Sequence, residues 1–420
     1  MKIRIKKTKM KIRIKKIKNC RICGNKDLKK ILTLGKQPLS GTFLKKNQIA
    51  EFAPLDLVYC HGKQNCNLVQ LHHSVDKNFL YGKNYGYRSG LNKSMVDHLK
   101  NKTILLRKIV KLSKGDTIID VGSNDCTTLK FFNRDIYKLV GVDPTGIKFR
   151  DYYPKDIKLI DKFFSKKVLK KANVKLAKII MSFAMYYDLE DPVRFAQEVE
   201  ENLDENGIWC FEQSYLPLMI KQLAYDTVCH EHIEYYGLKQ IKWILDRANF
   251  KIIDVKFNDI NGGSFSVIAA KKSSNFKVFN KLSYYLNSEI KLGLTSLNYY
   301  KKFSKKVKKH KKNLIALLKK IKNKNLKICA LGASTKGNVI LNYCGFNSNI
   351  IEEVGEVNNE KVGLFTPGSN IKITKESDCL KKKYDYYIIF PWHFKKFFLK
   401  IKKLKNKKLI FPLPEIKIYK

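Results

Sequence analysis

Two histidines flank a glutamate in the stretch Tyr225-Asp-Thr-Val-Cys-His-Glu-His-Ile-Glu-Tyr-Tyr236. In an extended segment His230 and His232 would point the same way and Glu231 the opposite way, because side chains alternate along a strand. Histidine titrates close to neutral pH and serves as a general base when a carboxylate orients it. We therefore predict a general base in this stretch. A metal site, or histidines that only satisfy hydrogen bonds within the fold, are the alternatives.

Four cysteines near the N-terminus have the chemistry of a metal site. Cys20 and Cys23 are separated by two residues, which is typical of one half of a tetrahedral zinc site, and Cys60 with Cys66 can supply the other half. Five residues separate the second pair, and His61 is a rival ligand. Four protein ligands leave no open position, so the predicted zinc is structural. Free buried thiols are the alternative.

A glycine turn follows the buried run from Thr117 to Val121, and a predicted helix over 127–132 follows the turn. Strand, glycine turn and helix open a mononucleotide-binding unit. A second buried strand ends at Asp143, where a carboxylate can hold ribose hydroxyls. The turn lacks a full G-x-G-x-x-G, so a small adenosyl ligand is favoured over a dinucleotide. The expected cofactor-binding residues are Asp120, Gly122, Ser123, Asn124, Asp143, Pro144 and Ser182.

Three further segments have side chains or backbone that suit a polar substrate. The loop from Tyr81 to Gly90 is rich in tyrosine and glycine, and an ordinary loop is the alternative to a substrate contact. A glycine pair before Ser264 predicts a hairpin tip that a ligand can approach, although a plain turn explains it equally well. A second glycine turn, Gly332 to Gly337, suits a phosphate or is only a packing turn, and it is not a Walker A motif. The expected substrate contacts are Tyr85, Tyr87, Gly263, Ser264, Ser334 and Lys336.

Alternating strands and helices must position these residues, and they predict an α/β protein of several domains. Strands are expected at 117–121, 139–143, 158–161, 178–183, 207–213, 251–258 and 264–271, the last two as an antiparallel hairpin. Further strands are expected at 371–373, 385–390 and 408–411, after the one that precedes Gly332. The predicted organisation is a basic disordered tail (1–19), a zinc-binding domain (20–80), a methyltransferase-like domain (81–275), a long helical linker (276–325) and a second Rossmann-like domain (326–420).

Composition narrows the classes of partner. The formal charge of +47 comes almost entirely from lysine spread through every segment, so we expect no nucleic-acid partner. Apolar runs are too short to span a bilayer, and the N-terminus lacks an apolar signal core. Ten cysteines without an export signal indicate reduced thiols or metal ligands. We predict a cytoplasmic monomer.

In its motifs the chain resembles the zinc-containing sugar C-methyltransferases, which act on nucleotide-linked keto-deoxysugars. The resemblance covers residues 20–420 and rests on these motifs in this order: Cys20/Cys23, Asp120-Val-Gly-Ser-Asn-Asp125, Val142-Asp-Pro144, His230-Glu-His232 with Tyr235-Tyr236, Gly262-Gly-Ser264 and Gly332-Ala-Ser-Thr-Lys-Gly-Asn338. It implies a zinc domain, a class I S-adenosylmethionine (SAM) domain and a C-terminal Rossmann-like domain. A sugar nucleotide would bind between the last two.

The resemblance also implies a mechanism and a role. His232 would be the base that removes a proton next to a carbonyl, with Glu231 or Tyr235 holding its imidazole, and His230 or the backbone of Gly263 and Ser264 would stabilise the enolate. The product would serve cell-surface polysaccharide or secondary-metabolite sugar biosynthesis. Departures from the family at Cys126, Met185 and Cys229 leave a sugar O-methyltransferase and a non-catalytic sugar-nucleotide-binding protein as alternatives.

Overall fold

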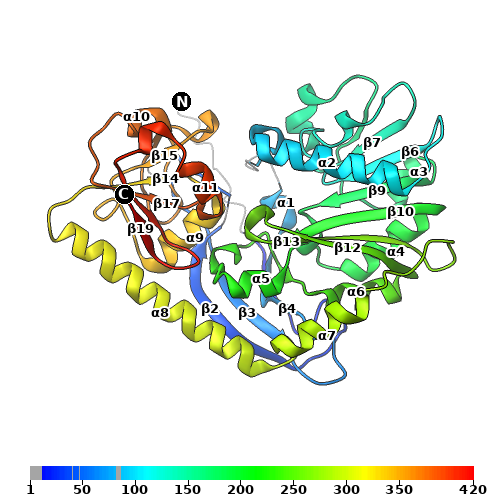
Figure 1. Ribbon diagram of the computed structural model, residues 1–420, viewed down its shortest axis with the longest axis horizontal. Coiled ribbons are helices and arrows are strands. Elements are labelled where there is room, and N and C mark those ends of the chain that lie inside the picture. The colour runs from blue at the N-terminus through cyan, green and yellow to red at the C-terminus, as the bar shows by residue number, and fades with distance from the viewer. Residues whose placement is uncertain (1–11, 40, 47, 82–86) are drawn as a thin grey trace, which may run out of the picture.

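A computed structural model describes residues 12–39, 41–46, 48–81 and 87–420. Two α/β lobes stand side by side, and a long antiparallel sheet lies beneath and between them (Figure 1). The lobe on the right contains the predicted methyltransferase-like strands, and the lobe on the left is the C-terminal domain. Within the described part of the chain, no helix is both long and apolar enough to cross a bilayer.

The central sheet of the first lobe has the seven predicted strands. Its order is β12-β13-β10-β9-β6-β7-β8, and β13 is antiparallel to both of its neighbours. The strands are β6 (Thr117–Val121), β7 (Lys138–Val142), β8 (Lys158–Ile160), β9 (Ala177–Phe183), β10 (Leu203–Ser214), β12 (Phe250–Asn258) and β13 (Ser264–Lys271). From β6 the chain adds strands first toward one edge of the sheet (β7, β8) and then, from β9, toward the other edge. A ligand is therefore expected at the carboxyl ends of β6 and β9, where the strand order switches sides.

Burial on both faces explains why β6 reads as one apolar run. Ile118 packs into the hydrophobic core on one face of the sheet, whereas Ile119 and Val121 pack into the core on the other. The helices of this lobe are α2 (Lys93–Ile109), α3 (Lys166–Lys171), α4 (Pro192–Asn202), α5 (Leu216–Lys221) and α6 (Leu238–Arg247). The predicted helix over 127–132 is wrong, because only a short 3-10 turn forms there, at Leu129–Phe131.

The sheet between the lobes has the order β11-β4-β3-β2, and one of its strands comes from far along the chain. Its strands are β2 (Leu28–Pro38), β3 (Phe52–Cys60), β4 (Val69–Leu71) and β11 (Glu234–Tyr235). A separate pair joins β1 (Ile14–Lys16) to β5 (His73–Val75). The prediction of a disordered tail is therefore wrong for Ile14–Lys16, and residues 1–11 lie outside the described part. A short helix, α1 (Lys77–Leu80), follows β5.

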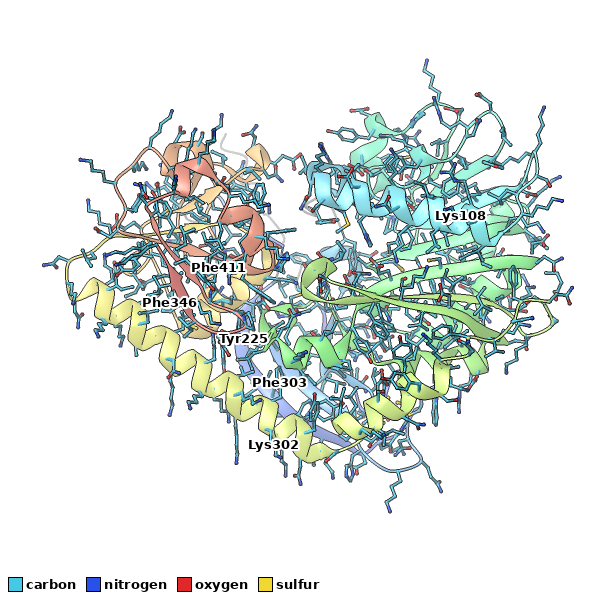
Figure 2. The ribbon with its side chains drawn as sticks, in the orientation of Figure 1. Lys108, Tyr225, Lys302, Phe303, Phe346 and Phe411 are labelled. Atoms are coloured by element: carbon cyan, nitrogen blue, oxygen red, sulfur yellow. The ribbon has the colours of Figure 1, made fainter. Side chains whose placement is uncertain are left out.

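The linker is two helices rather than one. The first, α7 (Leu282–Leu292), ends at Gly293, whose φ of +92° closes the helix in the left-handed conformation. The second, α8 (Leu297–Lys322), runs along the outside of the molecule (Figure 1). Figure 2 labels Phe303 on its buried face and Lys302 on its exposed face.

The C-terminal lobe is a six-stranded sheet of order β16-β15-β14-β17-β18-β19, parallel except for β19. Its strands are β14 (Ile328–Leu331), β15 (Val354–Glu356), β16 (Ile373–Lys375), β17 (Tyr386–Ile389), β18 (Lys408–Phe411) and β19 (Lys417–Tyr419). Its helices are α9 (Thr335–Cys344), α10 (Glu376–Cys379) and α11 (Lys395–Phe398). The sequence did not predict β15 and β19, although β16, which is equally short, lies next to the strand expected at 371–373.

Candidate active site and metal centre

The four N-terminal cysteines come together as one cluster. The Sγ atoms of Cys20 and Cys66 are 3.4 Å apart, and so are those of Cys23 and Cys60. All four sulfurs lie within 4.8 Å of one another. Zinc–sulfur bonds of about 2.3 Å in a tetrahedron place sulfurs about 3.8 Å apart, so the cluster fits the ion. The rival ligand His61 faces Asp27 instead, at 2.9 Å from Nδ1 to Oδ2.

His232 lies beside a small cavity at the carboxyl ends of the central strands. Its Nδ1 is 3.0 Å from the carbonyl oxygen of Thr227, which makes Nδ1 the donor and leaves a lone pair on Nε2. The ring of Tyr187, which follows β9, stands 4.3 Å from the imidazole. The residues that line the cavity are Tyr187, Ser214, Leu216, Met219, Thr227, His232, Glu234 and Tyr235.

Two parts of the chain hold this segment in place. After His232, strand β11 pairs with β4, so Tyr235 lies opposite Val69 of the N-terminal sheet. Before it, the 3-10 turn Tyr225–Thr227 is fixed to the C-terminal half of the chain. Tyr225, which Figure 2 labels between the lobes, packs on Tyr343 with ring centroids 5.5 Å apart. Both the zinc-binding unit and the C-terminal lobe therefore position the imidazole.

His230 does not point the same way as His232, so the expectation of an extended segment is wrong. A turn closes between them, in which the His232 N–H donates to the Cys229 carbonyl at 3.2 Å. His230 is buried, and its Nε2 lies 3.1 Å from the carbonyl oxygen of Ala53 on β3. The structure thus places His230 against the zinc-binding unit rather than beside a ligand.

The partner of the His232 imidazole is the Thr227 carbonyl, not Glu231 or Tyr235. The Glu231 carboxylate lies against Gly41, where a Cβ atom would be 2.9 Å from Oε1. Tyr235 is buried and helps to line the cavity. Sequence reasoning missed Thr227 because a backbone carbonyl has no signature in the residue type.

A lysine from the C-terminal lobe reaches the cavity region. The Nζ of Lys336 donates to the carbonyl of Asn261, at the tip of the β12–β13 hairpin, at 2.8 Å. Trp392 donates from Nε1 to Asp226 at 2.7 Å, which adds a second link between the lobes. Burial, with a smaller effect of the Lys336 charge, lowers the pKa of His232 to about 4. The imidazole is therefore neutral at physiological pH.

Two buried carboxylates, Asp120 and Asp143, lie beside the first glycine turn. Asp143 accepts hydrogen bonds from the backbone N–H of Asn124 at 2.8 Å and of Thr145 at 2.7 Å. Asp120 is buried, and burial, together with the smaller effect of the nearby Asp143 charge, raises the pKa of its carboxyl to about 8 against the opposing hydrogen bond with Thr128. Among the described residues no lysine or arginine forms an ion pair with Asp120. A cationic ligand group fits this carboxylate.

Other residues complete the turn. Gly122 has a φ of +77°, and a Cβ atom there would lie 3.1 Å from the side chain of Met185. Ser123 accepts from the Tyr153 hydroxyl at 2.8 Å, and Pro144 lies between Asp143 and the N-cap Thr145 of the 3-10 turn Gly146–Tyr152. Met185, a position where the sequence departs from the family pattern, therefore lies against the glycine turn.

The predicted substrate loop lies over the cofactor turn. Asn124 donates from Nδ2 to the carbonyl of Tyr87 at 3.1 Å, and the N–H of Ser89 donates to Asn124 Oδ1 at 3.0 Å. The N–H of Gly90 donates to Asp125 at 3.0 Å. Tyr85 lies outside the described residues. Hydrogen bonds therefore hold the segment from Tyr87 to Gly90 against the glycine turn, next to the predicted cofactor site.

Three residues that were predicted to contact the cofactor or the substrate contact other parts of the fold. Ser182 is buried and accepts from Trp209 Nε1 at 2.9 Å. Gly263 has a φ of +118° and packs against Leu218. The Ser264 hydroxyl donates to the Ile260 carbonyl at 2.9 Å.

Ser334 is the N-cap of α9, where its Oγ accepts from the Gly337 N–H at 3.0 Å. Beside this turn the structure adds a lysine that was not predicted, Lys361, whose Nζ donates to the Ala333 carbonyl at 2.9 Å.

Comparisons with known proteins agree with this architecture. Three family models match in succession: “Putative zinc binding domain” over residues 20–81, “Methyltransferase domain” over 96–255 and “C-methyltransferase C-terminal domain” over 259–414. The C-methyltransferase NovU of Streptomyces niveus is 25% identical over 413 residues, which is 96% of this chain and 97% of NovU.

Solved structures match a smaller part of the chain. The plantazolicin methyltransferase BpumL, in complex with a pentazolic desmethylPZN analog and SAH, is 12% identical, covers 41% of this chain and 83% of its own, and has a TM-score of 0.34. The [4+2]-cyclase SpnF is 11% identical, covers 41% of this chain and 80% of its own, and has a TM-score of 0.31.

The family models, the strand order and the four-cysteine cluster define an enzyme of the SAM-dependent methyltransferase class with a structural zinc site. More specifically, its succession of matched domains and its similarity to NovU over nearly the whole chain are those of a C-methyltransferase with a zinc-binding domain. The expected α/β fold, with a zinc-binding domain before the methyltransferase domain, is confirmed.

Proposed function

We propose that the enzyme methylates a carbon of a nucleotide-linked keto-deoxysugar, with His232 as the general base. The observation that carries this proposal is the state of the His232 imidazole. It is neutral, its Nδ1–H is held by Thr227, and its Nε2 is left to accept a proton beside a cavity. The motifs shared with the sugar C-methyltransferases support the choice of substrate class.

Each of these residues would have its own role in removing an acidic proton from the carbon next to a carbonyl. His232 would take the proton on Nε2, and the Thr227 carbonyl would stabilise the imidazolium that forms. The Lys336 ammonium, already close enough to affect His232, would stabilise the enolate oxygen. Once bound, SAM supplies the electrophilic methyl group.

The remaining polar residues can be assigned to the two ligands. Asp120 would hold the cationic end of SAM, and Asp143 with the turn from Gly122 to Asn124 would hold its ribose. Lys361 lies beside the turn before α9, and together with Ser334 at the N-cap it would meet the nucleotide phosphates of the acceptor. The acceptor would therefore bridge the two lobes. We place the product in cell-surface polysaccharide or secondary-metabolite sugar biosynthesis.

Mass spectrometry of nucleotide keto-sugars incubated with enzyme and SAM tests the proposal. We expect one sugar to gain a methyl group, and NMR of the product to show a new carbon–carbon bond. His232→Gln should lower kcat by about a hundredfold or more while calorimetric SAM binding is unchanged. His61→Gln, a histidine on the zinc-binding unit away from the cavity, is the control. A methoxy product, or full activity of His232→Gln, would overturn the proposal.

A further inference from the structure

A second cluster of metal-binding side chains lies in the C-terminal lobe. Cys329 belongs to the central strand β14, Glu353 directly precedes β15, and Cys379 ends α10. Their two sulfurs and a carboxylate oxygen all lie within 4.8 Å of one another. Both cysteines are fully buried, and Glu353 is 6% exposed. Three elements that are distant in sequence thus converge on one buried point.

Polar groups lie beside the Glu353 carboxylate and the Cys379 sulfur. Lys382 lies 2.6 Å from Oε2 of Glu353, so this carboxylate is ionised although it is buried. Its Oε1 is shielded from solvent and has no hydrogen bond of normal geometry within the described residues. The Thr374 hydroxyl is 2.8 Å from the Cys379 sulfur, where it can support a thiolate.

A bound divalent cation would also leave the cluster without excess charge. Two thiolates and a carboxylate carry three negative charges, which a divalent ion and the Lys382 ammonium cancel.

We propose that Cys329, Glu353 and Cys379 form a second metal site, which takes a thiophilic divalent cation such as zinc. Binding displaces the thiol protons to solvent and forms two metal–sulfur bonds and one metal–oxygen bond. The ion would join α10 and the segment before β15 to the central strand. This site is independent of the four-cysteine cluster and of the proposed substrate chemistry.

Metal analysis of the full-length protein tests the proposal. After exposure to zinc and removal of excess, wild type should hold about two zinc ions per chain, because both sites are filled. Cys329→Ser and Cys379→Ser should each hold about one. Cys344→Ser is the matched control, since it removes a buried thiol of the same lobe that lies outside the cluster, and it should retain both ions.

Cadmium NMR of the wild type decides the case even if the variants fail to fold. Two resonances are expected, one of an all-sulfur site and one displaced to higher field by an oxygen ligand. A single resonance together with about one zinc per chain would overturn the proposal. So would a disulfide between Cys329 and Cys379, detected by peptide mass spectrometry, because it would remove both thiolates from metal binding.

Discussion

A buried, neutral imidazole determines how the enzyme should respond to acid. The pKa of His232 is lowered from 6.5 to about 4, so the imidazole accepts a proton down to more acidic conditions than an exposed histidine. We expect kcat/KM to fall only below about pH 5. This acid limb of the pH profile reports the pKa of His232 in the free enzyme, because kcat/KM reflects the pKa values of groups in the unliganded state.

Removing the neighbouring charge should move that limb. In Lys336→Met the positive charge beside His232 is absent, so the pKa of the imidazole rises and the acid limb shifts to higher pH. Rate–pH profiles of both proteins measure the shift, and Lys372→Met, an exposed lysine of the same lobe, is the control. An unchanged limb in Lys336→Met would show that the lysine does not act on His232.

At the scale of elements, helix α7 holds the start of α6. The carboxylate of the buried Glu289 accepts hydrogen bonds from the N–H groups of Leu238 and Lys239 and from the Tyr215 hydroxyl. It therefore acts as an N-cap supplied by another helix, with its charge at the favourable end of α6.

Truncating this side chain should destabilise the fold. Glu289→Ala leaves buried N–H groups unpaired, and we expect the free energy of unfolding to fall by about 2 kcal/mol. Glu289→Gln keeps an acceptor but loses the charge, so about half of that loss is expected. Urea denaturation measures both, with the exposed Glu205→Ala as reference. Equal stability of Glu289→Ala and wild type would contradict the capping role.

The sequence predicted the strands of the methyltransferase sheet because burial left a pattern in them. Both faces of β6 are covered, so its apolar run identified it, and the acid after β7 followed at the expected spacing. The break of the linker at Gly293 was missed because the apolar spacing continues on both sides of it. The direction of His230 could not be predicted either, since it depends on a turn and on Ala53, which is far away in the chain.

At the scale of the whole molecule, the zinc site supports the catalytic segment from a distance. Cys60 ends β3, which pairs with β4, and β4 pairs with β11 directly after His232. Loss of zinc should therefore disturb the base more than the SAM site, which is formed by the turns after β6 and β7.

Chelation tests this coupling. We expect Cys20→Ser, or treatment with a chelator, to lower methyl transfer by about tenfold or more. SAM affinity, measured by calorimetry, should change by only about twofold. Restored activity on adding zinc back to chelated wild type is the control. A zinc-free enzyme with full activity would show that β11 keeps its place without the metal.

Strand β11 also restricts how such a gene can be shortened or recombined. A chain that started after residue 81 would keep the whole methyltransferase sheet but leave Glu234 and Tyr235 with no strand to pair against. If the zinc-binding domain were exchanged between relatives, the new β4 would have to pair with Glu234 and Tyr235, which lie more than a hundred and fifty residues further along the chain. We therefore expect the zinc-binding domain to be an integral part of the enzyme and not an exchangeable module.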